Sequence, residues 1–133
     1  MVILLTFIAA LSKSIIDILD HHYNDSLFSL FNPFTFGWEW FAPSKDSSKN
    51  KYKDVNTLEP KFFGSTTFFV WVTDAFHFFN MTYRLAFLGL IWYYAENGFT
   101  YFWWTDLPFI LCLHAVLFHL LYHHLLTKKF WRL

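Results

Sequence analysis

The sequence is poor in cysteine and in charged residues. Its single cysteine, Cys112, excludes an internal disulfide framework. Charged residues make up 15% of the 133 positions, whereas soluble domains typically contain about 25%. The formal net charge is zero, so the chain lacks the basic footprint of a nucleic-acid-binding protein. We therefore expect no nucleic-acid partner.

The chain is instead rich in apolar and aromatic residues. Hydrophobic residues account for 56% of the sequence and aromatic residues for 25%, including 19 Phe and 7 Trp. A soluble domain of this length has too unfavourable a ratio of surface to volume to bury so much aromatic area. The length allows one domain. We therefore expect a single membrane domain over residues 1–133, with the lipid bilayer as its partner.

Three apolar runs predict an all-α fold with transmembrane helices over residues 2–22, 65–94 and 106–126, each near the ~20 residues that a crossing needs. The first run is soon interrupted by Lys13, Asp17 and Asp20, so a helix lying in the interface is the alternative and would leave two crossings. The same run lacks the positive start of a signal peptide. We expect Ser65 or Thr66 to cap the second helix, Thr105 or Asp106 to cap the third, and Pro108 to occupy its first turn.

Two different segments separate the first two predicted helices. Residues 24–44 combine many Phe and Trp with Pro33, Gly37 and Pro43, a pattern typical of an aromatic segment at the lipid headgroups. Residues 45–61 form a hydrophilic loop in which lysines outnumber acids. The C-terminal KKFWRL is also basic, so the positive-inside rule places this loop and the C-terminus in the cytoplasm and the N-terminus outside. In this multi-pass topology Arg84 lies near the outer end of its helix and Lys13 pairs with an acid.

Ionisable residues inside apolar helices are costly, and they indicate a function by default. Asp74 and His77 share one helix face, as do His119 and His123. Counted from the cytoplasmic helix ends at ~1.5 Å per residue, five of the candidates lie at depths of roughly 8 to 18 Å: Asp17, Asp74, His77, His114 and His119. Imidazole and carboxylate groups on facing helices build metal sites, with Zn or Fe as the expected ion. The candidate ligands are Asp74, His77, His119, His114, His123 and Asp17.

The structural alternative is that these groups are interfacial histidines and a hydrogen-bonded Asp74–His77 pair that locks helices together.

Two stretches resemble known families. HLLYHH, residues 119–124, resembles a histidine box of the membrane fatty-acid desaturases and hydroxylases, which implies a di-iron centre on the cytoplasmic side. The chain has no second HxxHH box, so a complete desaturase is not expected. KNKYK and KFFGSTTFFVWVTDAFHFF, within residues 49–79, resemble a family of small uncharacterised integral membrane proteins from phage and bacterial genomes. This resemblance implies a membrane location.

Two functions of different classes follow from the sequence. The first is an integral membrane protein whose inner-leaflet Asp/His site binds a metal or relays protons. The second is a non-enzymatic, self-associating membrane protein, a homo-oligomer such as a phage holin-like pore former. Close helix association favours small residues, and Gly89 is the only glycine well inside a predicted helix. The bulky aromatic residues and the buried Asp and His therefore count against the second function.

Overall fold

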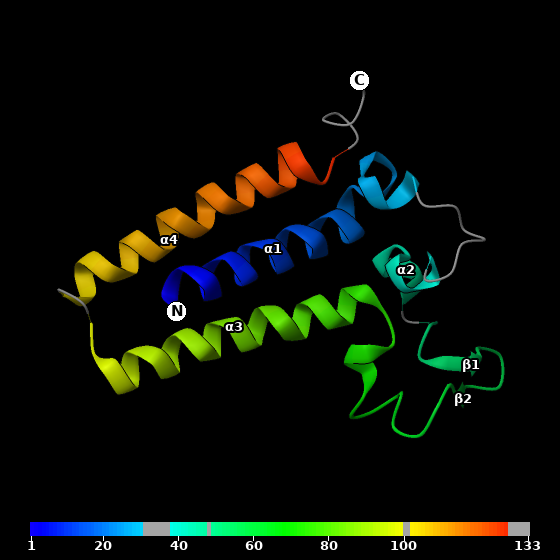
Figure 1. The fold of residues 1–133 in the computed structure, drawn as a ribbon. Coiled ribbons are helices and arrows are strands. Elements are labelled where there is room, and N and C mark those ends of the chain that lie inside the picture. Colours follow the sequence, from blue (N-terminus) through cyan, green and yellow to red (C-terminus); the bar gives the residue numbers. More distant parts are fainter. Residues whose placement is uncertain (31–37, 48, 100–101, 128–133) are drawn as a thin grey trace.

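The computed structural model describes residues 1–30, 38–47, 49–99 and 102–127. Three long helices lie side by side, with α1 between α3 and α4 (Figure 1). They are α1 (Val2–His21), α3 (Ala75–Asn97) and α4 (Trp103–Leu120), which continues into a π-helical turn at Leu121–Leu125. The chain runs in one direction along α1 and α4 and in the opposite direction along α3.

Short elements connect α1 to α3 at one end of these helices (Figure 1). They are the 3-10 turns η1 (Tyr23–Asp25), η2 (Leu27–Leu30), η3 (Trp38–Phe41) and η4 (Val70–Val72), the helix α2 (Ser44–Ser47) and the strands β1 (Tyr52–Asp54) and β2 (Glu59–Pro60). The strands form an antiparallel hairpin in which Tyr52 pairs with Pro60 and Asp54 with Glu59. The predicted helical fold is thus confirmed in the main, with this hairpin inside the predicted loop 45–61.

Two helices are long and apolar enough to cross a membrane by length and composition, Val2–His21 and Trp103–Leu125. α3 has sufficient length at 23 residues but does not meet the same test. Its sequence includes His77, Asn80 and Arg84, which dilute its apolar character. The structure therefore supports two of the three predicted crossings by this criterion.

Small residues allow α1 to approach its neighbours closely. Ala9 and Ala10 are fully buried in α1. A Cβ atom added to Gly89 of α3 would lie 3.3 Å from both δ carbons of Leu5. The Ser14 hydroxyl donates to the Ala10 carbonyl at 2.8 Å and lies 3.4 Å from the Phe118 carbonyl of α4. Close backbone approach of this kind is typical of helix packing in membranes.

A hydrophobic core lies where the chain turns back at the end of α1. Ile15, Ile18 and Leu19 of α1 pack there with Phe28, Ala75 and Leu126. The Leu27 amide donates to the Leu126 carbonyl at 2.8 Å, so the segment after α1 is tied to the end of α4. Tyr23 packs against this core, and burial raises the pKa of Tyr23 to about 12.

The start of α3 differs from the prediction by ten residues. The predicted helix begins at residue 65, whereas α3 begins at Ala75 and ends at Asn97. Ser65 is fully buried and its hydroxyl donates to the Lys51 carbonyl at 2.8 Å, so it anchors the preceding loop instead of capping a helix. Gly64 takes a positive φ of 80°, which supports a turn at this position. Apolar content alone made residues 65–74 resemble a helix.

The third predicted helix also begins differently. α4 starts at Trp103, three residues earlier than predicted, so Thr105 and Asp106 lie inside its first turn and Phe102 takes the capping position without a side-chain bond. Pro108 is therefore the sixth helical residue instead of a first-turn residue, and its missing N–H removes one helical hydrogen bond. The first helix matches its prediction to within one residue.

Parts of two predicted segments lie outside the described residues. These are Pro33 and Gly37 of the aromatic segment and the basic tail 128–133.

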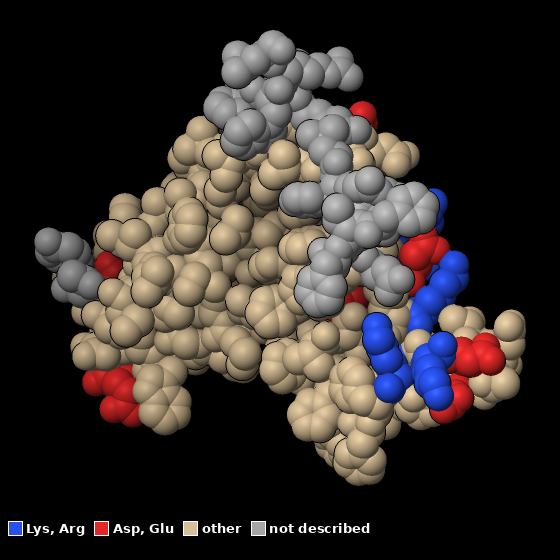
Figure 2. Space-filling view, turned by 45° about the vertical axis from the view of Figure 1, so that its right-hand side comes forward, with Lys and Arg blue, Asp and Glu red and all other residues tan. Residues whose placement is uncertain are grey.

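Charged and apolar side chains separate along the molecule. On the face shown in Figure 2, Lys and Arg gather at one end, acidic residues occupy the two ends, and the middle carries neither. The outer surfaces of α3 and α4 expose large apolar side chains in this middle region, among them Leu85, Leu88, Ile91, Phe109, Leu111 and Val116. At the end of the molecule opposite α2, residues of α3 and α4 also line an apolar cavity of about 490 Å³. Leu90, Tyr94 and Leu107 are among the lining residues.

Candidate functional site at the start of helix α3

Asp74 is the N-cap of α3. Its backbone is extended, with φ −159° and ψ 164°, and its Oδ1 accepts the His77 backbone N–H at 2.9 Å. An N-cap Asp satisfies one of the amide groups that a helix start leaves without a partner. The segment Thr73–Asp74–Ala75 therefore starts the helix here, since Asp caps better than the aromatic residues before it. Asp74 thus lies at the end of the helix and not ~13 Å inside it, as the sequence predicted.

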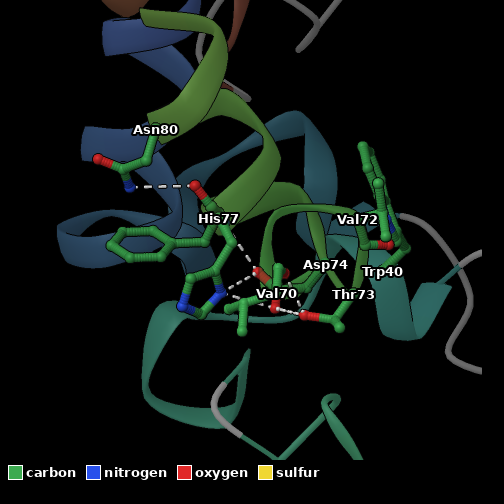
Figure 3. Close-up of polar contacts among 8 residues, drawn as sticks. Trp40, Val70, Val72, Thr73, Asp74, His77 and Asn80 are labelled. Atoms are coloured by element: carbon green, nitrogen blue, oxygen red, sulfur yellow. Dashed lines mark hydrogen bonds and ion pairs between the residues drawn. The ribbon is translucent and has the colours of Figure 1, made fainter. Parts of the chain in front are cut away.

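The Asp74 carboxylate also holds the His77 ring. Nδ1 of His77 lies 2.9 Å from Oδ1 and 2.8 Å from Oδ2 of Asp74 (Figure 3). The Thr73 hydroxyl lies 2.9 Å from Oδ2 and 2.7 Å from the Val70 carbonyl. The Asp74 side chain is 0% exposed, and the His77 side chain is 33% exposed. The carboxylate accepts the Nδ1 proton, so Nε2 is left for a second hydrogen-bonding partner.

Several donors converge on the Asp74 carboxylate at the start of α3. The helix N-terminus itself carries a partial positive charge. Burying a carboxylate is costly unless such donors surround it. The single Thr73 hydroxyl proton lies within reach of two acceptors, so it bonds either the Val70 carbonyl or the Asp74 carboxylate. The arrangement can therefore orient the His77 imidazole.

The neighbouring turns hold this cap in place. Nε1 of Trp40 in η3 donates to the Val72 carbonyl at 3.4 Å, and the Trp40 ring lies against Phe78 and Phe79 of α3. Figure 3 shows Trp40 and Val72 beside the Asp74 cluster. The aromatic segment between α1 and α2 thus supports the start of α3.

The other predicted site residues lie in separate places. His119 and His123 are close on α4, with ring centroids 4.6 Å apart, and both are exposed. His114 lies among aromatic rings, 6.2 Å from the Phe87 centroid, and its buried Nε2 has no hydrogen-bond partner in the described part of the chain. Asp17 pairs with Lys13 at 2.6 Å, which confirms that Lys13 finds an acidic partner.

The six candidate ligands do not converge on one centre. Among the described residues, no group of three or more His, Cys, Asp or Glu side chains is placed to hold a metal ion. Asp74 is engaged as a helix cap and Asp17 in an ion pair. The expected Zn or Fe centre joining three helices is therefore not formed by these residues. The HLLYHH segment likewise ends in a π-helical turn at Leu121–Leu125.

The predicted position of Arg84, near the outer end of its helix, is wrong. Because α3 starts ten residues later and ends three residues later than predicted, Arg84 lies 9 residues from Ala75 and 13 from Asn97. It is thus nearer the Asp74 end and not the opposite end. The signal that could have shown this is the spacing Asp74–x–x–His77, in which a capping residue precedes its bonded N–H by three positions.

Comparison with protein-family models, curated proteins and solved structures finds no match to this chain. The two resemblances drawn from the sequence therefore stay predictions.

Proposed function

We propose that this chain is an integral membrane protein with three crossings and that its Asp74–His77 pair is a proton-binding site at the cytoplasmic interface. The observation that carries the proton-binding role is the fully buried Asp74 carboxylate bonded to Nδ1 of a partly exposed histidine. Histidine is the side chain whose protonation ordinarily changes near neutral pH. A pair of one carboxylate and one imidazole is sufficient to hold a proton, whereas a structural zinc site needs four ligands.

The arrangement of the three helices supports three crossings. α1, α3 and α4 run antiparallel in succession (Figure 1), as alternate crossings require. Although α3 contains polar residues, it exposes Leu85, Leu88 and Ile91 from its middle onward, as a lipid-facing helix does. The lysine-rich loop 45–61 adjoins the Asp74 end of α3, so the positive-inside rule assigns this end to the cytoplasm and the N-terminus to the outside.

Infrared difference spectroscopy during a pH titration tests the proton-binding pair. Wild-type protein in detergent is compared with Asp74→Asn, His77→Gln and the matched control His123→Gln, which removes an exposed histidine of the last helix. We expect carboxyl and imidazole bands that change together as the pH is varied. Both pair variants should remove this joint change, and His123→Gln should leave it intact.

A purely structural pair gives a different result. The two variants would then change stability while the pH-difference spectra matched those of the wild type, and the proton-binding proposal would be rejected. The experiment therefore separates a helix cap from a protonation site even though one carboxylate performs both tasks.

The alternative function remains a self-associating pore former. A pore between copies needs polar side chains on the outer surface of the helices. Thr6, Ser12 and Ser14 of α1 are buried within one chain, so α1 does not offer these side chains to a pore between copies. Efflux of a fluorescent dye from vesicles containing the purified protein distinguishes the two, since only the pore former releases it.

A further inference from the structure

The outer face of α3 carries a polar stripe in its first half. The buried residues Ala75, Ala86 and Leu90 mark the side of α3 that faces the rest of the molecule. At 3.6 residues per turn, Arg84 points roughly 120–180° away from them. Asn80, one turn earlier, lies on the same side as Arg84, and Arg84 is exposed. A positive side chain therefore faces outward from the middle part of a helix.

Arg84 has no partner within the described part of the chain: it makes no hydrogen bond, ion pair or ring contact there. Its Cα lies roughly 13 Å from the start of α3, at 1.5 Å for each of 9 residues. A charged side chain at such a depth is expensive in a bilayer. Helical side chains tilt toward the N-terminus of their helix, so the guanidinium extends toward Asn80 and the Asp74 end. An anionic partner is expected at this level.

A second copy of the chain offers few free acidic partners for Arg84. Of the acidic side chains that the described residues leave exposed, Asp20 bonds Ser44 and His21, Glu59 pairs with Lys53, Glu96 lies at the other end of α3, and Asp25 remains. Asp17 lies deeper but is already paired with Lys13. A membrane lipid offers a phosphate near each interface.

We propose that the outer face of α3 binds the phosphate of an anionic phospholipid from the leaflet on the Asp74 side. The planar Arg84 guanidinium is suited to two parallel bonds to phosphate oxygens. Nδ2 of Asn80 donates one hydrogen to the Phe76 carbonyl at 3.0 Å, and its second hydrogen is available to the phosphate. Leu88 and Ile91 continue the same side toward the membrane centre and are 59% and 65% exposed, which provides an apolar path for an acyl chain.

This inference rests on the proposed crossing by α3, but it does not depend on proton binding at Asp74–His77. Protein purified in detergent is incubated with equal amounts of phosphatidylglycerol and phosphatidylcholine, and the retained lipids are counted by native mass spectrometry. The variants are Arg84→Gln, Arg84→Lys and Asn80→Leu, with Lys53→Gln as the control for an exposed cation outside the helices.

We expect wild-type protein and Lys53→Gln to retain phosphatidylglycerol at least about fivefold over phosphatidylcholine, which corresponds to roughly 1 kcal/mol. Arg84→Gln should remove this preference, and Arg84→Lys should keep only part of it, because an ammonium lacks the two-pronged geometry. Asn80→Leu, which adds no charge to the membrane, should weaken the preference about two- to threefold and tests the site even if Arg84→Gln inserts poorly.

Two outcomes overturn the proposal. If Arg84→Gln and Asn80→Leu both retain the wild-type preference, the phosphate does not bind at this stripe. If lipid retention is unchanged while Arg84→Gln shifts the oligomer mass, Arg84 contacts another protein chain instead. A failed proton titration would leave the lipid result untouched, so the two proposals fail separately.

Discussion

At the scale of single residues, polar groups in this chain act locally. Asp74 bonds to Thr73 and His77, which are its sequence neighbours. Asp17 pairs with Lys13 one helical turn away. Such short-range partners could be predicted from spacing alone, and the sequence indeed predicted the Asp74–His77 pair and a partner for Lys13. It could not predict that Asp74 starts its helix, because the apolar residues before it are compatible with either helix or turn.

Replacement of Asp74 by Ala should destabilise the fold by about 1–2 kcal/mol, because α3 loses its cap and the His77 amide loses its acceptor. Asp74→Asn should cost less, since Asn caps helices nearly as well. Thermal unfolding in detergent followed by circular dichroism measures both. The matched control is Asp46→Ala, since this partly exposed acid bonds Lys49 in the connecting segment. Equal losses for Asn and Ala at position 74 would contradict the capping role.

The Tyr23 phenol should lose its proton at a higher pH than an ordinary tyrosine does. Burial raises its pKa to about 12, so the folded protein holds the phenolic proton more tightly than the unfolded chain does. Its contribution to stability is complete below pH about 10 and is lost as pH rises toward 12. Subtracting the ultraviolet absorbance titration of Tyr23→Phe from that of the wild type isolates this phenol. A difference curve centred near pH 10 would show that the ring is solvated.

At the scale of elements, helix ends depend on individual residues that the apolar pattern does not reveal. Gly98 ends α3 with φ 70°, and its amide donates to the Tyr94 carbonyl at 2.9 Å. The turn at Asn97 and Gly98 was predictable because glycine favours this conformation. The early start of α4 at Trp103 was not, since aromatic residues at an interface carry no capping signal. The existence and the approximate position of the long helices could be predicted from the lengths of the apolar runs.

The contact between α1 and α3 should be sensitive to the size of residue 89. Gly89→Leu should destabilise the fold by about 1–3 kcal/mol, because even a Cβ would meet the Leu5 side chain at 3.3 Å. Gly89→Ala should have a smaller effect, since the Leu5 terminal carbons can rotate away. Ala115→Leu introduces the same side chain at an exposed position of α4 and serves as the control. Similar unfolding temperatures for Gly89→Leu and Ala115→Leu would contradict a close contact at residue 89.

At the scale of the whole molecule, the apolar middle and charged ends of the face in Figure 2 agree with the composition of the sequence. The side-by-side order of the helices, with α1 in the centre, was not predictable. It depends on which face of each helix carries small residues: Ala9 and Ala10 are fully buried in α1, and Gly89 of α3 lies against Leu5 of α1. The same packing separates the candidate metal ligands. The depth of a residue along its helix does not determine which neighbouring helix its side chain faces.

The proposed topology can be measured by cysteine labelling. In a Cys112→Ala background, Lys53→Cys should react with a membrane-impermeant maleimide only after the cytoplasmic side is opened, and Asn97→Cys should react in intact cells. Both positions are exposed. Labelling of both positions from the same side would exclude a crossing by α3. If the two positions were labelled from the opposite sides to those expected, α3 would still cross the membrane, but in the opposite orientation.

The central place of α1 also bears on how the protein is made. α1 leaves the ribosome first, yet α3 begins 54 residues after its end, at Ala75. At ~5–20 residues per second, synthesis of this stretch takes roughly 3–11 s. During that time the Thr6, Ser12 and Ser14 side chains have neither of the helices that later cover them. The Thr6 and Ser14 hydroxyls donate to the Val2 and Ala10 carbonyls of α1 itself, so the first helix satisfies them before α3 and α4 are made, and packing of the three helices is expected to follow synthesis of the last one.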